Sequence, residues 1–132
     1  MEDRIKKLIE EELDIAEKRL KAAEILLKEG MLADAVNRVY YAIFYAAKAM
    51  LNSAGYDAKT HSGLISEFGL RLVKEGFVSR KYGKILRNAF EKRESSDYEI
   101  GAIFERREVE SLLKDAKEFL KKAKKFVKKN LS

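Results

Sequence analysis

Cysteine, proline and tryptophan are absent from this sequence of 132 residues, and histidine occurs once, as His61. Without cysteine the chain forms no disulfide and has no thiolate for a metal, so a structural zinc site is effectively excluded. The absence of proline and a charged fraction of 38%, dominated by Lys and Glu, are typical of helical proteins and favour a thermophilic source.

Long uncharged hydrophobic runs are also missing, and the chain opens with charged residues between Glu2 and Lys7. We therefore expect no membrane span and no signal peptide, and hence a soluble, cytoplasmic protein. The length is about that of one ordinary domain, which predicts a single domain over residues 1–132.

The net charge of +6 is concentrated near the end of the chain, where residues 114–129 include eight lysines against Asp115 and Glu118. A basic helix of this kind attracts phosphates non-specifically. A lysine-rich face that only keeps the protein soluble is the simpler interpretation.

Apolar residues recur at helical spacing along nearly the whole chain, and glycines at 30, 55 and 76 stand where helices would end. The pattern predicts helices over about 3–29, 32–54, 61–74, 80–94 and 105–129, with Thr60 or Ser62 capping the third, Ser79 capping the fourth, and a loop over 94–101. Short links make neighbouring long helices antiparallel. The expected fold is all-α, an up-and-down four-helix bundle with an additional short helix.

The second predicted helix has two different sides. A core side carries Val36, Val39 and Ile43, with Tyr40 and Phe44 at its edge. The other side gathers amides, cations and phenols in place of the usual Glu/Lys mixture: Asn37, Arg38, Tyr41, Tyr45, Lys48 and Asn52. Tyrosine and arginine suit a nucleotide, because a ring stacks on a base and a guanidinium binds phosphate. They are equally typical of an interface between helices or subunits.

Two further positions are candidates for chemistry. Arg93 and Asp97 could pair where the chain leaves the bundle, whereas an unpaired Arg93 facing a cleft would be a phosphate ligand. His61 begins a predicted helix and is the one conventional general base of the chain, although a lone histidine at a helix start is more often structural. P-loop, G-x-S-x-G, H-E-x-x-H and Glu-x-x-His patterns are absent, which argues against the standard NTPase, hydrolase and di-iron classes.

Three segments together resemble the HEPN domain family, above all its small stand-alone archaeal and bacterial members. They are Asp34-Ala35-Val36-Asn37-Arg38-Val39-Tyr40-Tyr41-Ala42-Ile43-Phe44, then Lys59-Thr60-His61-Ser62-Gly63, then Arg93 with Asp97-Tyr98. The resemblance implies an all-α bundle that commonly forms dimers, with a polar cleft between the second and fourth helices. It also implies nucleotide binding or metal-independent RNase activity, often as a toxin paired with a small nucleotidyltransferase.

In the active RNases of the family, an arginine is followed after four to six residues by a histidine. Arg93 matches that arginine, but no histidine follows it, so the motif is incomplete and Asp97 or His61 would have to serve as the base. Tyr98 loosely resembles a tyrosine that is nucleotidylated in some toxins of the family. Asn37, Arg38 and Tyr41 match the polar positions of the family cleft.

The resemblance and the residues together lead to one expectation. It is a homodimer beside a nucleotidyltransferase partner, with no metal and no cofactor. It binds a nucleotide or RNA through six residues: Asn37, Arg38, Tyr41, Tyr45, Arg93 and Tyr98. One alternative is an endoribonuclease toxin that uses Arg93 with Asp97 or His61. Another is a dimeric scaffold without a ligand.

Overall fold

The computed structural model describes residues 2–97 in full, the backbone of Tyr98, and residues 103–132. Its helical elements are α1 (Asp3–Lys28), α2 (Leu32–Ser53), α3 (His61–Phe68), the π-helical segment η1 (Gly69–Val73), α4 (Arg80–Tyr98) and α5 (Arg106–Leu131). The expected all-α bundle is confirmed.

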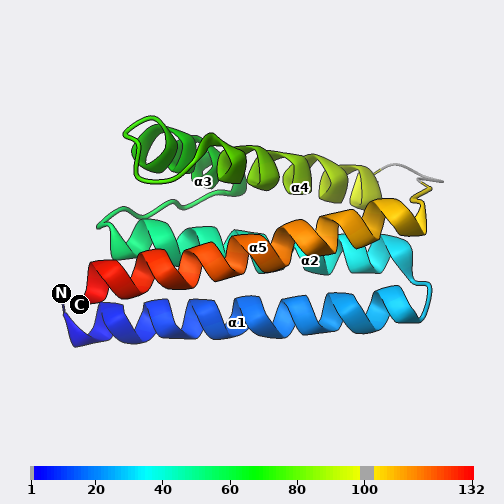
Figure 1. Cartoon of the computed structure of the whole chain (residues 1–132), viewed down its shortest axis with the longest axis horizontal. Helices are drawn as coiled ribbons and strands as arrows, with labels where there is room; N and C mark the ends of the chain where they lie inside the picture. The colour runs from blue at the N-terminus through cyan, green and yellow to red at the C-terminus, as the bar shows by residue number, and fades with distance from the viewer. Residues whose placement is uncertain (1, 99–102) are drawn as a thin grey trace.

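The long helices run up and down, with α2 at the centre (Figure 1). α1 and α2 form an antiparallel pair, α5 packs against both, and α4 packs against the opposite side of α2. α3 and η1 cover one end of the bundle, near both chain termini. Because α2 contacts every other α-helix, most of its surface is buried and only one narrow strip reaches solvent.

The core consists of the apolar faces that the helical spacing predicted. Tyr40, Phe68 and Phe119 are its largest fully buried side chains. Alanines at seven positions along α1 and α2 allow those two backbones to approach closely: Ala16, Ala23, Ala35, Ala42, Ala46, Ala47 and Ala49. This packing fixes the orientation of α2, and with it the strip that is left open.

The glycines and hydroxyl side chains that were predicted to mark helix ends are confirmed in that role. Gly30, Gly55 and Gly76 all have a positive φ, at 76°, 89° and 82°, which glycine adopts without strain. Thr60 caps α3 by accepting a hydrogen bond from the Gly63 amide at 2.9 Å. Ser79 accepts one from the Lys81 amide at the start of α4.

Two boundaries differ from the prediction. α4 continues to Tyr98, so the loop expected over 94–101 is wrong for residues 94–98, and residues 99–102 lie outside the described part of the chain. The Arg93–Asp97 ion pair and a bond from Ser96 Oγ to the Arg93 carbonyl stabilise this extra turn. The predicted third helix ends in the π-helical segment η1. No helix within the described residues is long and apolar enough to span a membrane.

Candidate functional site

The open strip of α2 is where the polar side of the helix reaches the surface. Asn37, Tyr41, Tyr45 and Lys48 are half-buried there, and Arg38 is exposed. Their spacing of three or four residues keeps them on one face, between the buried sides that contact α1 and α4. The side chains of α3 and α4 that meet this strip form the rest of the site.

His61, the first residue of α3, lies against the aromatic residues of α2. Its Nδ1 is 2.6 Å from the Tyr40 hydroxyl, and its ring stacks on Phe44 with centroids 4.5 Å apart. Tyr41 meets the same imidazole edge-on, with centroids 5.8 Å apart. Nε2 has no hydrogen-bond partner within the described residues, so it is the nitrogen left for a ligand.

Arg93 approaches the same two tyrosines from α4. Its guanidinium carbon lies 5.4 Å from the Tyr40 ring centroid and 5.7 Å from that of Tyr41, which are cation–π distances. One terminal nitrogen donates to the Tyr41 hydroxyl at 3.4 Å, and Nε is 2.9 Å from Asp97 Oδ2. The ion pair expected between Arg93 and Asp97 is therefore present, and only 15% of the Arg93 side chain is exposed.

Asn37 completes the polar group, because its amide nitrogen lies 3.5 Å from Asp97 Oδ1. Asp97 thus bridges the arginine of α4 and the amide of α2. A phosphate oxygen arriving here would find the same donors that Asp97 now faces, namely the Arg93 guanidinium and the Asn37 amide. We call Asn37, Tyr40, Tyr41, Phe44, His61, Arg93 and Asp97 the α2–α4 site.

The protonation states of the site follow from burial. Desolvation, with smaller contributions from the charges of Arg93 and Lys48, lowers the pKa of His61 below 6.5. Burial also raises the pKa of Tyr40 well above 10, so its phenol stays neutral. At neutral pH the imidazole is therefore uncharged and able to accept a proton.

The structure brings together most, but not all, of the residues predicted from the sequence. Arg38 is exposed and makes no hydrogen bond or ion pair within the described residues. Tyr45 packs edge-on against Phe44, with centroids 5.2 Å apart, at the margin of the site. The side chain of Tyr98 lies outside what the structure describes.

Tyr40 and Phe44 are the residues that the sequence reasoning missed. They were assigned to the core alone, and they are buried, but they also hold His61. The sequence does contain a signal for this contact. A tyrosine at a core position needs a hydrogen-bond partner for its hydroxyl, which predicts a polar residue on the element that packs against it. Among the described residues, no three His, Asp or Glu side chains are grouped to bind a metal ion.

Comparison with known proteins tests the family resemblance. The sequence profile of the HEPN domain matches residues 9–126. The chain belongs to the HEPN family. This HEPN chain is 39% identical to “Putative toxin MJ0605” of Methanocaldococcus jannaschii, over 87% of its own length and 85% of that protein. It is 33% identical to “Putative toxin MJ0142” of the same organism, over 86% and 77% of the two chains.

A relative from Thermotoga maritima, named only “UPF0332 protein”, is 38% identical over 74% of each chain. The resemblance inferred from the second helix, the His61 segment and Arg93 is therefore confirmed at the level of the family. The α2–α4 site joins the second and fourth α-helices, the two between which the resemblance leads us to expect a polar cleft.

Proposed function

We propose that this HEPN protein is the RNA- or nucleotide-binding toxin of a toxin–antitoxin pair, working as a homodimer beside a small nucleotidyltransferase. The phosphate binds at Arg93 and Asn37, and a base stacks on the tyrosines of α2. Two of its relatives carry the name “Putative toxin”, which supports the assignment to this kind of system.

The observation that carries the proposal is the position of Arg93. Its guanidinium is held between two tyrosine rings and a carboxylate, so its planar donors are already oriented before any ligand arrives. Pre-orientation of this kind lowers the entropy lost when a ligand binds. A phosphate can take the place of Asp97, while the exposed Arg38 adds a second positive charge on the same strip.

The test is the affinity for a labelled single-stranded RNA, ATP and AMP, measured by fluorescence polarisation and calorimetry at several salt concentrations. Replacing Arg93 by Ala should weaken binding about tenfold or more, which is about 1.4 kcal/mol, and Arg38→Ala should weaken it less and flatten the salt dependence. Arg87→Ala, an exposed arginine of the same helix, is the control and should bind like the parent. Equal binding by all four proteins would refute the proposal.

Metal-independent RNA cleavage is the second candidate function, and it rests on the position of His61. The His61 imidazole and the Arg93 guanidinium contact the same two tyrosine rings, and this proximity supports a role for His61 as the base that the incomplete family motif lacks. In the tautomer whose Nδ1–H donates to the Tyr40 hydroxyl oxygen, His61 Nε2 would take the proton of a ribose 2′-hydroxyl. The 2′-oxygen would then bond to phosphorus as the bond from phosphorus to the 5′-oxygen breaks, and the leaving 5′-oxygen would take a proton from solvent. Arg93 would stabilise the charge that develops on the phosphate.

Cleavage is tested by incubating RNA with the protein in EDTA and analysing the ends by mass spectrometry. The mechanism predicts a 2′,3′-cyclic phosphate and a 5′-hydroxyl. His61→Ala should lose cleavage while it still binds RNA, whereas Arg93→Ala should lose both. Asp97→Asn decides between the two candidate bases, because it should retain cleavage if His61 is the base. Intact RNA after long incubation with the parent would exclude this function and leave the binding proposal standing.

A further inference from the structure

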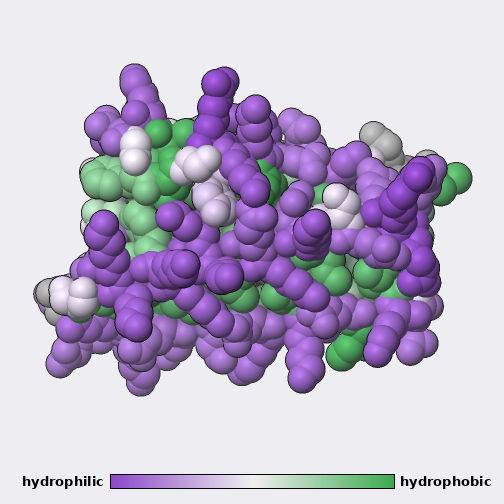
Figure 2. All heavy atoms as spheres, viewed as in Figure 1, coloured by the Kyte–Doolittle hydropathy of each residue, from purple (hydrophilic) through white to green (hydrophobic). Residues whose placement is uncertain are grey.

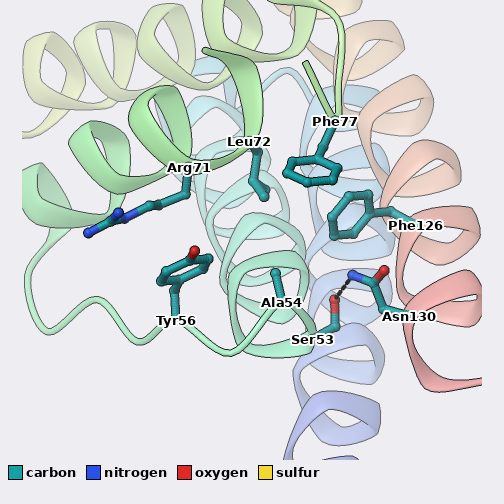
Figure 3. A pocket seen from close by; sticks show the side chains of 8 residues that line it. All are labelled: Ser53, Ala54, Tyr56, Arg71, Leu72, Phe77, Phe126 and Asn130. Atoms are coloured by element: carbon teal, nitrogen blue, oxygen red, sulfur yellow. Dashed lines mark hydrogen bonds between the residues drawn. The ribbon is translucent and has the colours of Figure 1, made fainter. Parts of the chain in front are cut away.

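A pocket of about 290 Å³ lies at the end of the bundle where α2 and α5 finish, apart from the α2–α4 site. Its lining comes from three segments far apart in sequence: Ser53, Ala54, Tyr56, Arg71, Leu72, Phe77, Phe126 and Asn130. Figure 3 shows these side chains around the hollow, with the hydrogen bond from Asn130 to Ser53 on one side. None of them belongs to the α2–α4 site.

Exposed aromatic side chains mark this pocket. Phe77 is 65% exposed and Tyr56 is 38% exposed, although both are large enough to be expected inside. Figure 3 shows the Phe77 and Phe126 rings next to each other at one side of the pocket. In Figure 2, hydrophobic atoms gather between α3 and the C-terminal end of α5, on a face that is otherwise mostly hydrophilic. Patches of this kind commonly mark interaction sites.

The π-helical segment η1 builds one wall of the pocket. It contributes Leu72, which is buried, and Arg71, whose guanidinium carbon lies 4.9 Å from the Tyr56 ring centroid. Glu67 holds the same guanidinium at 3.1 Å and so fixes its position. π-helical turns are rare and occur frequently at functional sites, which sets this wall apart from an incidental surface hollow.

The surroundings of the pocket are basic. The last turns of α5 carry six lysines between positions 121 and 129 and no acidic residue. Lys129 stands three residues after Phe126, on the face of α5 that borders the pocket. Lys122 stands four residues before Phe126, with its ammonium nitrogen 5.9 Å from the centroid of the Tyr82 ring. Lys129 makes no ion pair within the described residues. Glu75 lies in the turn that leads to Phe77, and Glu67 is already paired with Arg71.

We propose that this pocket binds an acidic peptide segment of a partner protein. One bulky apolar side chain of the peptide enters beside Phe77 and Phe126, and carboxylates on either side of it pair with Lys122 and Lys129. The volume is at the lower limit of ligand pockets, which suits a single anchoring side chain better than a whole small molecule. This inference does not depend on the function proposed for the α2–α4 site.

Single-stranded RNA is the competing class of ligand, because it also combines stacking with positive charge. RNA-binding surfaces present flat, open aromatic platforms along a groove. Here the buried Leu72 closes the hollow from within, and Phe126 is itself half-buried. A concave, apolar wall favours an inserted side chain over a stacked base.

The test begins with a phage-displayed library of random peptides of about 12 residues, selected against the full chain. The selected peptides should carry one Phe, Trp or Leu between Asp and Glu residues. Synthetic copies of these peptides should bind the Phe77→Ala variant about tenfold more weakly than the parent. They should bind the double variant Lys122→Gln, Lys129→Gln about fivefold more weakly. Because Phe77 is mostly exposed, its replacement should leave the fold intact.

Two matched variants serve as controls. Ile25→Ala removes a side chain that is 55% exposed on α1, and Lys21→Gln with Lys28→Gln removes two exposed lysines of the same helix. Both should bind the selected peptides like the parent. The proposal would be overturned if the selection yielded no acidic peptides, or if the selected peptides bound Phe77→Ala as tightly as the parent. The proposal would also be overturned if the parent bound no peptide and the Phe77→Ala variant lost the binding of labelled RNA or no longer formed a dimer.

Discussion

At the scale of single residues, His61 connects three elements of the molecule. Its ring is enclosed by Tyr40 and Phe44 of α2, and the positive charge of Arg93 comes from α4. Since it is the chain's one histidine, its imidazole resonances can be followed individually by NMR. The protonation of His61 therefore reports on the site without any knowledge of the ligand.

We predict that His61 titrates below 6.5, mainly because of desolvation and secondly because of Arg93. Arg93→Gln should raise its pKa toward the usual value, while Arg87→Gln should leave it unchanged. Since the folded pKa lies below the unfolded one, protonation favours the unfolded chain, and this contribution to stability is lost as the pH falls below 6.5. Titration at or above 6.5 in the parent would contradict the geometry of the site.

Glu12 is a second buried titratable group, between α1 and α2. Its side chain is 4% exposed, and Oε1 accepts a hydrogen bond from the Asn52 amide at 2.8 Å. Desolvation raises the pKa of Glu12 above 4.5, against the lowering effects of the Asn52 hydrogen bond and the Lys48 charge. The folded protein therefore holds this proton to a higher pH than the unfolded chain does.

From this difference we predict that stability falls as the pH rises from 4.5 through the folded pKa of Glu12. Glu12→Gln should remove that decrease and raise the melting temperature at pH 7 by about 2–4 °C, because no carboxylate has to be ionised in a buried position. Glu10→Gln, an exposed neighbour, should leave it in place. Calorimetric melts between pH 4 and 8 measure the effect, and identical pH profiles for parent and Glu12→Gln would contradict it.

At the scale of elements, the start of α3 determines where His61 is held. Thr60 Oγ1 accepts the Gly63 amide, and a Cβ added at Gly63 would lie 2.6 Å from that oxygen. Gly69 offers a comparison in the same region, because it has helical φ and ψ of −62° and −45° and nothing within 4 Å of an added Cβ. Substitutions at the two glycines therefore distinguish the stability lost with the Thr60 cap from the stability that is ordinarily gained when glycine in a helix is replaced by alanine.

We predict that Gly69→Ala stabilises the protein by about 0.5–1 kcal/mol, because alanine loses less backbone entropy than glycine on folding. The free energy of unfolding of Gly63→Ala should be about 1 kcal/mol lower than that of Gly69→Ala, because an N-cap typically contributes about that much. Gly63→Ala should also disturb the His61 resonances. Urea unfolding at equilibrium measures both variants. Equal stabilisation by the two substitutions would show that the cap contributes nothing to α3.

At the scale of the whole molecule, we expect the open strip of α2 to form the interface between two copies of the chain in a dimer. It combines Tyr45 and Arg38, residue types that are enriched in interfaces, with the rim of the α2–α4 site. A dimer formed here would place two such sites next to each other across a two-fold axis. The pocket beside Phe77 is lined by other residues and would remain free.

The predicted dimer has twice the 15.2 kDa mass of one chain in light scattering. Tyr45→Glu should produce monomers and weaken RNA binding, because it would bury an unpaired charge in the interface. Phe77→Ala should leave the dimer unchanged and so serves as the control for loss of an exposed aromatic ring. A parent that is monomeric at all concentrations would contradict the dimer while leaving the test of Arg93 unaffected.

The sequence by itself determined most of what depends on neighbours along the chain. Helical spacing, the glycines at 30, 55 and 76 and the Thr60 cap predicted the helices, whereas the last turn of α4, which contains the Arg93–Asp97 ion pair, was expected to be a loop. These are local effects, because a helix brings residues three or four positions apart together whatever surrounds it. The motif around Asn37 and Arg38 also identified the family.

Only the tertiary structure decided which of these elements meet. The partnership of Tyr40 with His61 spans 21 positions, and that of Tyr41 with Arg93 spans 52. Such contacts depend on how α3 and α4 pack against α2, and helix packing is set by the shapes of whole surfaces. For the same reason the pocket beside Phe77, which combines residues 53 to 130, has no signature in the sequence. The helices were therefore predictable from their own residues, and the sites between them were not.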